Sequence, residues 1–289
     1  MDTTRAIKRR IKSIGSTQQI TRAMNLVAAS KLTRAKNKLE SARPFYRETR
    51  RVIEHLAALS GKVSNPYLTG RPVKTTGVIV IAGDRGLCGG YNINVCKLAA
   101  GLIAEKGAHE SLIAVGTKSR DYFRRRRKNI IRTYQGISES PFYEDAAEIG
   151  HLAADCYNSG EMDEVYLVYS EFKSAMAQEP KAVKILPVEL GQDAGADGEN
   201  QSGTAGMTDF EPDEDTLLSL IIPKYINTVI YGAMVEASAC EQGARMTGMD
   251  AATKNSLKLI NGLTLTYNRA RQGAITQEIN EIVGGANAT

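Results

Sequence analysis

KYINTVIYGAMVEASACEQGARMTGMDAATKNSLKLINGLTLTYNRARQGAITQEINEIV, residues 224–283, is a stretch that no proline interrupts. Within it, small or apolar residues return every three or four positions, which is the spacing of one helix face. They are Ile226, Val229 or Ile230, Ala233, Ala237, Cys240, Ala244 and Thr247, and later Tyr267, Ala270, Ala274, Ile275, Ile279 and Ile282. The pattern predicts one very long helix.

The length of this helix limits the possible architectures. About 60 residues, rising about 1.5 Å each, extend roughly 90 Å. A compact globule of 289 residues is only roughly 50 Å across. The helix therefore cannot lie inside one globule, and its apolar side needs another long element to cover it.

The N-terminal segment, about residues 3–58, supplies such an element. Its apolar or small residues recur with a mean step of about 3.5, the coiled-coil period. They are Ile7, Ile11, Ile14, Thr17, Ile20 or Thr21, Met24, Ala28, Leu32, Ala35, Leu39 and Ala42. Pro44 predicts a kink, but the apolar spacing resumes after it, so we expect a kinked continuation. The two termini are therefore predicted to form an antiparallel helical hairpin.

The middle of the chain has a different pattern. The apolar runs GVIVIA (77–82), SLIAVG (111–116) and EVYLVYS (164–170) alternate with helix-like stretches at 91–106, 117–127 and 143–159, and residues 181–188 form a further strand-like run. This alternation predicts a parallel-type α/β sheet. We predict an N-terminal helix at 1–60, an α/β domain at 75–190, a flexible loop at 190–209 and a C-terminal helix at 210–289, begun by Pro212 and its acidic neighbours.

Two pairs of glycines recur at the same spacing within the predicted C-terminal helix. Gly232 and Gly243 are separated by three helical turns, as are Gly262 and Gly273. Each glycine costs about 1 kcal/mol relative to alanine in a helix interior. We therefore expect a neighbouring backbone to approach closely at these positions.

Composition excludes several classes of protein. No apolar run reaches the roughly 18 residues that span a bilayer. Four separated cysteines predict reduced thiols, and three isolated histidines predict neither a metal site nor a catalytic triad, so we predict no cofactor. The net charge of +5 is concentrated in the first 51 residues, which predicts an acidic partner: nucleic acid, anionic lipid or an acidic protein surface. The run 124–128 is interpreted as a solvated helix end.

The loop GDRGLCGGYN, residues 83–92, follows an apolar strand and leaves two interpretations open. One is an α/β nucleotide-binding enzyme that uses the Gly83–Gly90 loop; the other is a structural turn. The spacing of its glycines matches neither GxGxxG nor GxxxxGK[ST], and no lysine follows. A third class, a basic coiled-coil protein that binds nucleic acid, is weakened by the absence of tryptophan and of any known binding module.

Several further strings resemble one family. They are 11–14 (IKSI), 17–24 (TQQITRAM), 26–32 (LVAASKL), 84–92 (DRGLCGGYN), 174–180 (SAMAQEP), 244–246 (ARM), 249–255 (MDAATKN), 267–272 (YNRARQ) and 275–279 (ITQEI). Together they resemble the gamma subunits of F-type ATP synthases of the bacterial kind, over nearly the whole chain. The inserted cysteine pair of the chloroplast form is absent.

The resemblance implies a central-stalk rotor: a coiled-coil shaft with an inserted Rossmann-like α/β domain. It implies that proton flow turns a c-ring, and that the shaft then drives the catalytic beta subunits through ATP synthesis and hydrolysis. The subunit would not be an enzyme itself. Its implied partners are the hexameric ring of alpha and beta subunits, the epsilon subunit and the c-ring, with no nucleic acid. Its implied place is peripheral, on the cytoplasmic face of a bacterial plasma membrane, held there only through the complex.

The resemblance also implies contact residues. Those facing the alpha and beta ring are Arg22, Met24, Arg245, Arg271, Gln272, Thr276 and Glu278, and those facing the c-ring are Phe210 and Glu211. The guanidinium of Arg245 would hold a beta-subunit carboxylate, since arginine can bind a carboxylate through two hydrogen bonds. No catalytic, cofactor-binding or metal-binding residue is implied.

Overall fold

The computed structural model describes residues 4–59, 65–188 and 214–286. The chain divides into two compact units. Unit 1 contains residues 1–29 and 245–289, and unit 2 contains residues 30–244.

Two helices form the ends of the chain, as predicted. Helix α1 covers Thr4–Leu59, 56 residues, and includes Pro44. Helix α5 covers Glu214–Ala286, 73 residues, and includes Pro223. The predicted continuation past Pro44 is confirmed, whereas the predicted helix start around Pro212 lies outside the described residues.

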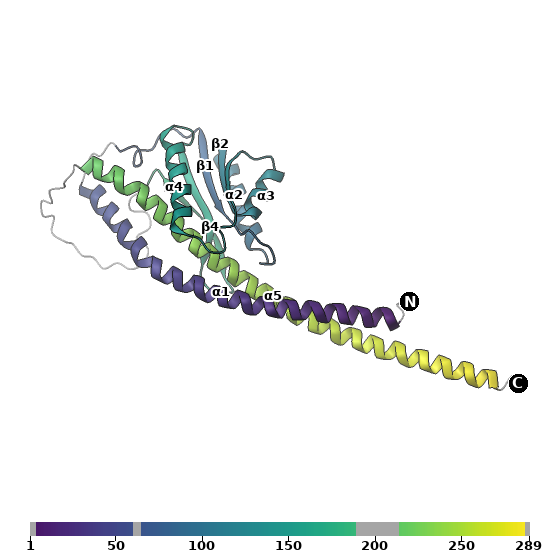
Figure 1. The fold of residues 1–289 in the computed structure, drawn as a ribbon. Helices are drawn as coiled ribbons and strands as arrows, with labels where there is room; N and C mark the ends of the chain where they lie inside the picture. The colour runs from purple at the N-terminus through teal and green to yellow at the C-terminus, as the bar shows by residue number, and fades with distance from the viewer. Residues whose placement is uncertain (1–3, 60–64, 189–213, 287–289) are drawn as a thin grey trace. The chain divides into compact units, whose positions relative to one another are not determined.

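A five-stranded sheet forms the centre of unit 2 (Figure 1). Its strands are β1 (Thr75–Ile81), β2 (His109–Val115), β3 (Ile130–Tyr134), β4 (Glu164–Phe172) and β5 (Gln178–Leu186), and their order is β3-β2-β1-β4-β5. The first four strands are parallel to their neighbours, and β5 runs antiparallel to β4. The predicted parallel-type sheet is therefore confirmed, with one antiparallel edge strand. The apolar pattern misses β3, because the run IIRTY holds only two aliphatic residues, and all five of its residues are exposed or half-buried.

Helices cover both faces of this sheet (Figure 1). Successive side chains of a strand point to opposite faces, so Val78 and Val80 pack with α2 (Tyr91–Lys106) and α3 (Thr117–Arg125). Ile79 and Ile81 pack on the other face with α4 (Tyr143–Asn158) and with the α5 segment 222–237. This second cluster is the main core of unit 2, and it fixes α5 against the sheet.

The glycine prediction is confirmed at one position and wrong at three. A Cβ at Gly243 would lie 3.2 Å from the carbonyl oxygen of Ala175, so the turn between β4 and β5 approaches the α5 backbone there. At Gly232, Gly262 and Gly273 no described atom outside the local helix lies within 4 Å of such a Cβ. The close approach at Gly243 comes from a hairpin turn of the sheet, which helix periodicity cannot predict.

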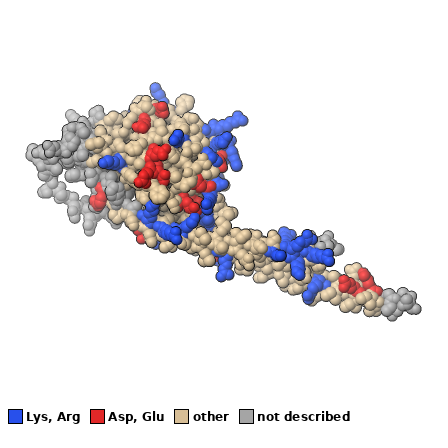
Figure 2. Space-filling view, viewed as in Figure 1, with Lys and Arg blue, Asp and Glu red and all other residues tan. Residues whose placement is uncertain are grey.

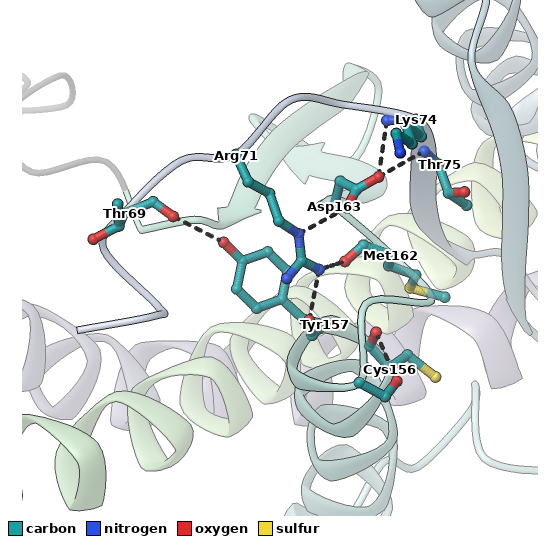
Figure 3. Close-up of polar contacts among 9 residues, drawn as sticks. Thr69, Arg71, Lys74, Thr75, Cys156, Tyr157, Met162 and Asp163 are labelled. Atoms are coloured by element: carbon teal, nitrogen blue, oxygen red, sulfur yellow. Dashed lines mark hydrogen bonds and ion pairs between the residues drawn. The ribbon is translucent and has the colours of Figure 1, made fainter. Parts of the chain in front are cut away.

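Arg71 fastens the segment before β1 to the turn between α4 and β4 (Figure 3). Its Nε donates to Asp163 Oδ1 at 2.7 Å, and its Nη2 donates to the main-chain oxygens of Tyr157, at 2.6 Å, and Met162. The other carboxylate oxygen of Asp163 accepts the backbone N–H groups of Lys74 and Thr75 at 2.8 and 2.9 Å. The planar guanidinium also lies 4.6 Å from the centre of the Tyr157 ring. This cluster fixes where the chain enters the sheet.

We expect Arg71→Lys to lower the free energy of unfolding by about 1–2 kcal/mol, since an ammonium cannot reproduce the forked donation or the stacking. Chemical denaturation of the full chain, followed by circular dichroism, measures this. Arg132→Lys is the control, because Arg132 forms an exposed ion pair 3.7 Å from Glu148, and such pairs contribute about 0–1 kcal/mol. Equal losses in both variants would contradict the structural role of Arg71.

Candidate functional site

Two polar contacts fix the register of the helix pair in unit 1. The hydroxyl oxygens of Thr21 and Thr253 lie 2.8 Å apart. Asn25 Nδ2 donates to the main-chain oxygen of Met246, also at 2.8 Å. Residue numbers rise along α1 as they fall along α5, so the helices are antiparallel here, as predicted. A polar side chain at a seam position favours one register over its neighbours.

Burial along α1 corrects the predicted seam in detail. Ile7 and Ala28 are buried, but the seam passes through half-buried Gln18 and buried Thr21. Thr17 is exposed, and the side chain of Ile20 is 59% exposed, so the prediction of Thr17 is wrong. At the next step the prediction gave Ile20 or Thr21, and Thr21 is the buried one.

Three of the residues predicted to face the alpha and beta ring differ in exposure. Arg22 is exposed and Met24 is half-buried on α1. Arg245 is only 6% exposed. A residue predicted to meet a partner carboxylate is thus buried within this chain, which residue spacing alone did not indicate.

The other four residues predicted to face the ring lie along the C-terminal part of α5. At the register given by the two polar contacts, Thr4 at the start of α1 lies opposite residues 267–270 of α5. All described side chains at 271–283 are exposed, including Arg271, Gln272, Thr276 and Glu278. Arg245 and Arg271 are separated by about 39 Å of helix at 1.5 Å per residue. The structure therefore does not bring the two groups together, and Phe210 and Glu211 lie outside the described residues.

Apolar side chains are exposed on both helices of unit 1. On α1 these are Ile20, Leu26 and Val27, and on α5 they are Leu257, Leu259, Leu265, Ile275, Ile279, Ile282 and Val283. Figure 2 shows these helices with Lys and Arg side chains beside broad uncharged areas, and with Asp and Glu side chains nearer the C-terminal end. Exposed apolar surface of this extent is typical of a surface that a partner covers.

In the glycine-rich loop 83–92, the Asp84 carboxylate accepts hydrogen bonds from the turns that follow β2 and β3. Asp84 Oδ1 accepts the Thr117 N–H and hydroxyl, each at 2.9 Å. Asp84 Oδ2 accepts the Gly136 N–H and the Ser138 hydroxyl, each also at 2.9 Å. These donors follow the carboxyl ends of β2 and β3, on the edge of the sheet at which α/β proteins bind ligands, whereas the switch point of this strand order lies between β1 and β4. A carboxylate of the chain thus accepts the donors beside the loop, which favours the structural interpretation of the loop over a nucleotide site.

Electrostatics keep the Asp84 carboxylate charged. Burial alone raises its pKa, but the hydrogen bonds from Gly136, Thr117 and Ser138 together hold the pKa below the usual value. Hydrogen bonds to the charged form have this effect because they disappear on protonation.

The thiols of unit 2 are suited to packing and not to nucleophilic chemistry. All four cysteines are free and buried. Burial raises the pKa of Cys96 to about 12 and that of Cys156 to about 11, and it also raises the pKa of Cys240. An uncharged thiol is a poor nucleophile. Among the described residues, no group of three or more His, Cys, Asp or Glu side chains could hold a metal ion.

Sequence reasoning missed two acidic residues of unit 2. Glu241 is 1% exposed on α5, and its carboxylate carbon would lie 2.7 Å from a Cβ at Gly83. Because Glu241 follows Cys240, which lies on the predicted apolar stripe, the sequence could have indicated that Glu241 is buried. Glu139 lies in the loop between β3 and α4 and accepts the Lys31 ammonium at 2.6 Å. No pattern within the loop sequence SESPFYED indicates that contact.

Comparison with known proteins gives a consistent family. A family model described as ATP synthase matches residues 3–289. The ATP synthase gamma chain of Desulforamulus reducens is 48% identical over 288 residues, covering 100% of this chain and 99% of the relative. A relative from Acetobacterium woodii, described as an ATP synthase gamma chain, sodium ion specific, is 42% identical and covers 98% of this chain and 97% of the relative.

Solved structures share the fold. A chain of the mitochondrial ATP synthase of Euglena gracilis, in a structure containing OSCP, F1 and the c-ring, superposes with a TM-score of 0.67 at 18% identity. The match covers 99% of this chain and 94% of that one. Within the described residues, no helix has both the length and the apolar character needed to span a bilayer. The chain belongs to the ATP synthase gamma-chain family, and its function is that of the non-catalytic gamma subunit, the central-stalk rotor of an F-type ATP synthase.

Proposed function

We propose that one copy of this chain occupies the centre of a hexameric ring of alpha and beta subunits, with the epsilon subunit and a c-ring as further partners. The catalytic sites lie on the beta subunits, and this chain carries rotation to them. We also propose the functional division into shaft helices at 1–60 and 210–289, an α/β domain at 75–190 and a connecting loop at 190–209.

The exposed apolar face at the end of α5 is the observation that supports this assembly most directly. Ile275, Ile279 and Ile282 are 46%, 53% and 71% exposed. Their spacing of four and three residues places them on one helix face. A helix that exposes isoleucine to water at this spacing gains about 25 cal/mol for each Å² that a partner covers. A closed ring around the helix would provide that cover.

The contact residues follow from this arrangement. We propose that Arg22 and Met24 contact the ring from α1, and that Arg245, Arg271, Gln272, Thr276 and Glu278 contact it from α5. The exposure of Arg22 and of the residues from 271 onward supports this proposal. Arg245 is 6% exposed, so a partner could contact only the small exposed part of its side chain. Phe210 and Glu211 are proposed to face the c-ring.

The proposed place of the complex is the cytoplasmic face of a bacterial plasma membrane, with this chain peripheral and held through its partners. The proposed coupling ion is the proton. Because one relative is described as sodium ion specific, ATP-driven uptake should be measured in vesicles with each ion varied separately. Uptake that depends on sodium and not on pH would contradict the proton assignment.

The proposed assembly predicts a defined complex. When the chain is produced together with alpha, beta and epsilon subunits, we expect a stable complex that contains one copy of it. We expect the double variant Ile275→Ser, Ile279→Ser to bind the ring about thirtyfold more weakly, because about 2 kcal/mol of apolar burial is lost. Native mass spectrometry during dilution measures this.

The matched control is Gln277→Ala, on the opposite side of the same helix, for which we expect less than about a threefold change. A chain that remains a stable, partner-free oligomer in the presence of the other subunits would refute the proposed assembly.

A further inference from the structure

The loop between β3 and α4 joins the sheet to both long helices within unit 2. We call residues 138–142 the brace. At its start, the Ser138 hydroxyl donates to Asp84 Oδ2 at 2.9 Å and accepts the Asp84 N–H at 3.0 Å. Ser138 is itself 6% exposed. The brace therefore begins at a buried anchor on the carboxyl edge of the sheet.

Glu139 contacts both helices from this anchor. Its Oε1 lies 2.6 Å from the Lys31 ammonium on α1. Its main-chain oxygen accepts the Ser238 hydroxyl on α5 at 3.0 Å. Ser238 is 3% exposed, and the two charged side chains are about one third exposed. One residue thus ties α1 and α5 to the sheet and to each other.

The following residues extend the same connection. The Lys38 ammonium donates to the main-chain oxygen of Pro141. It also lies 5.4 Å from the centre of the Phe142 ring and 5.5 Å from that of Tyr231 on α5. A cation over two aromatic faces is attracted by both. Lys31 and Lys38 are two helical turns apart on α1, so the brace follows one face of that helix.

The positions of these contacts give them a mechanical meaning. Lys31 precedes the end of α1 at Leu59 by 28 residues, about 42 Å of helix. Ser238 follows the start of α5 at Glu214 by 24 residues, about 36 Å of helix. The chain ends of these two helix segments are therefore far from Glu139. Because the core cluster already packs α5 against the sheet along 222–237, the brace matters most for α1. Without it, twist could be lost by movement of α1 past α5 and the sheet.

We propose that Glu139 is a positioning residue that transmits torque between the α/β sheet and the helix pair, through Lys31 on α1 and Ser238 on α5. This inference rests on the rotor function and on the proposed assembly. The ion pair contributes charge attraction that can be inverted without changing the backbone, whereas the Ser138 anchor and the Ser238 bond hold the loop in place. Arg85 Nη1 also lies 3.9 Å from Glu139 Oε1, but the Arg85 side chain is 73% exposed and can turn into solvent when the charges are swapped.

A charge-swap experiment in the assembled complex tests this role. The complex is reconstituted in vesicles, and the ions pumped per ATP hydrolysed are measured for Lys31→Glu, for Glu139→Lys and for the double variant. We expect each single variant to lower this ratio about twofold to fivefold, in line with the strength of a half-exposed ion pair. The double variant restores the pair in reverse order, and we expect its ratio to lie within about twofold of the unmodified complex.

The control is the same set of changes at Lys36 and Glu40, an exposed pair 3.7 Å apart on α1 alone, for which no change in the ratio is expected. If single variants at Lys31 and Glu139 unfold more easily yet pump as many ions per ATP, Glu139 is only structural and the proposal is overturned. Failure of the double variant to recover also overturns it. If Lys31→Glu prevents assembly, Lys31→Met replaces it as the single variant. It is then expected to lower the ratio as Glu139→Lys does, and an unchanged ratio for Lys31→Met overturns the proposal. Failure of the unmodified chain to assemble would instead contradict the proposed function.

Discussion

Gly116→Ala is expected to lower the free energy of unfolding of unit 2 by about 3–5 kcal/mol. Gly116 connects β2 to α3 with φ 89° and ψ 146°, a conformation that is almost restricted to glycine. A Cβ there would overlap the carbonyl oxygen of Ala82 and would lie 2.8 Å from its carbonyl carbon. Both atoms belong to backbone, so no side-chain rotation can relieve the overlap.

The neighbouring contacts increase this cost. The Gly116 N–H donates to the Tyr134 oxygen at 2.7 Å, and the Ala82 N–H donates to the Val115 oxygen at 3.0 Å. Any shift that accommodates the new methyl group therefore disturbs the ends of β1, β2 and β3 together. Chemical denaturation of the full chain, followed by circular dichroism, provides the free energy.

Gly101→Ala is the matched control for Gly116→Ala. Gly101 lies within α2, and no described atom outside its local helix comes within 4 Å of its added Cβ. Alanine in a helix interior is favoured over glycine by about 0.5–1 kcal/mol, so we expect this variant to be slightly more stable. A Gly116→Ala variant as stable as the unmodified chain would show that the turn between β2 and α3 can adopt another path.

The long helices and the sheet could be predicted because local patterns determine them. Helix periodicity persists through α1 and α5, and the strands β1, β2 and β4 each contain a continuous apolar run. The antiparallel pairing of β5 follows from a hairpin with β4, and it could not be read from strand composition. β3 has too few apolar residues to be distinguished from a loop.

The contacts of the candidate site were less predictable, because they join residues far apart in sequence. The Asp84 carboxylate satisfies donors that lie 33 and 52 residues away, and the Lys31 ammonium pairs with a carboxylate 108 residues away. Glycine spacing correctly weakened the nucleotide interpretation of the Gly83–Gly90 loop. It could not show that Asp84 accepts donors from the turns after β2 and β3. That assignment required the three strand ends to be placed beside one another.

Asp84→Asn is expected to destabilise unit 2 by about 3 kcal/mol at neutral pH. The amide preserves the shape of the side chain, but its NH₂ group must face a donor. Either Thr117 or the pair Gly136 and Ser138 then loses its acceptor, because both carboxylate oxygens are in use. Hydrogen bonds to a charged group contribute about 1.5–3 kcal/mol each, and the partial exposure of Asp84 keeps the total well below their sum.

The pH dependence distinguishes this electrostatic role from loss of shape. The pKa of Asp84 is lower in the folded chain than its usual value of 3.8. Its contribution to stability is therefore fully present above that value and is lost as pH falls through the lower, folded pKa. The difference in unfolding free energy between the unmodified chain and Asp84→Asn should be constant from about pH 7 to pH 5 and should shrink below about pH 4.

Asp121→Asn is the control, since Asp121 pairs with Arg120 at the surface and such pairs contribute about 0–1 kcal/mol. A difference for Asp84→Asn that stays constant down to pH 2 would show that the Asp84 charge does not hold the three strand ends together.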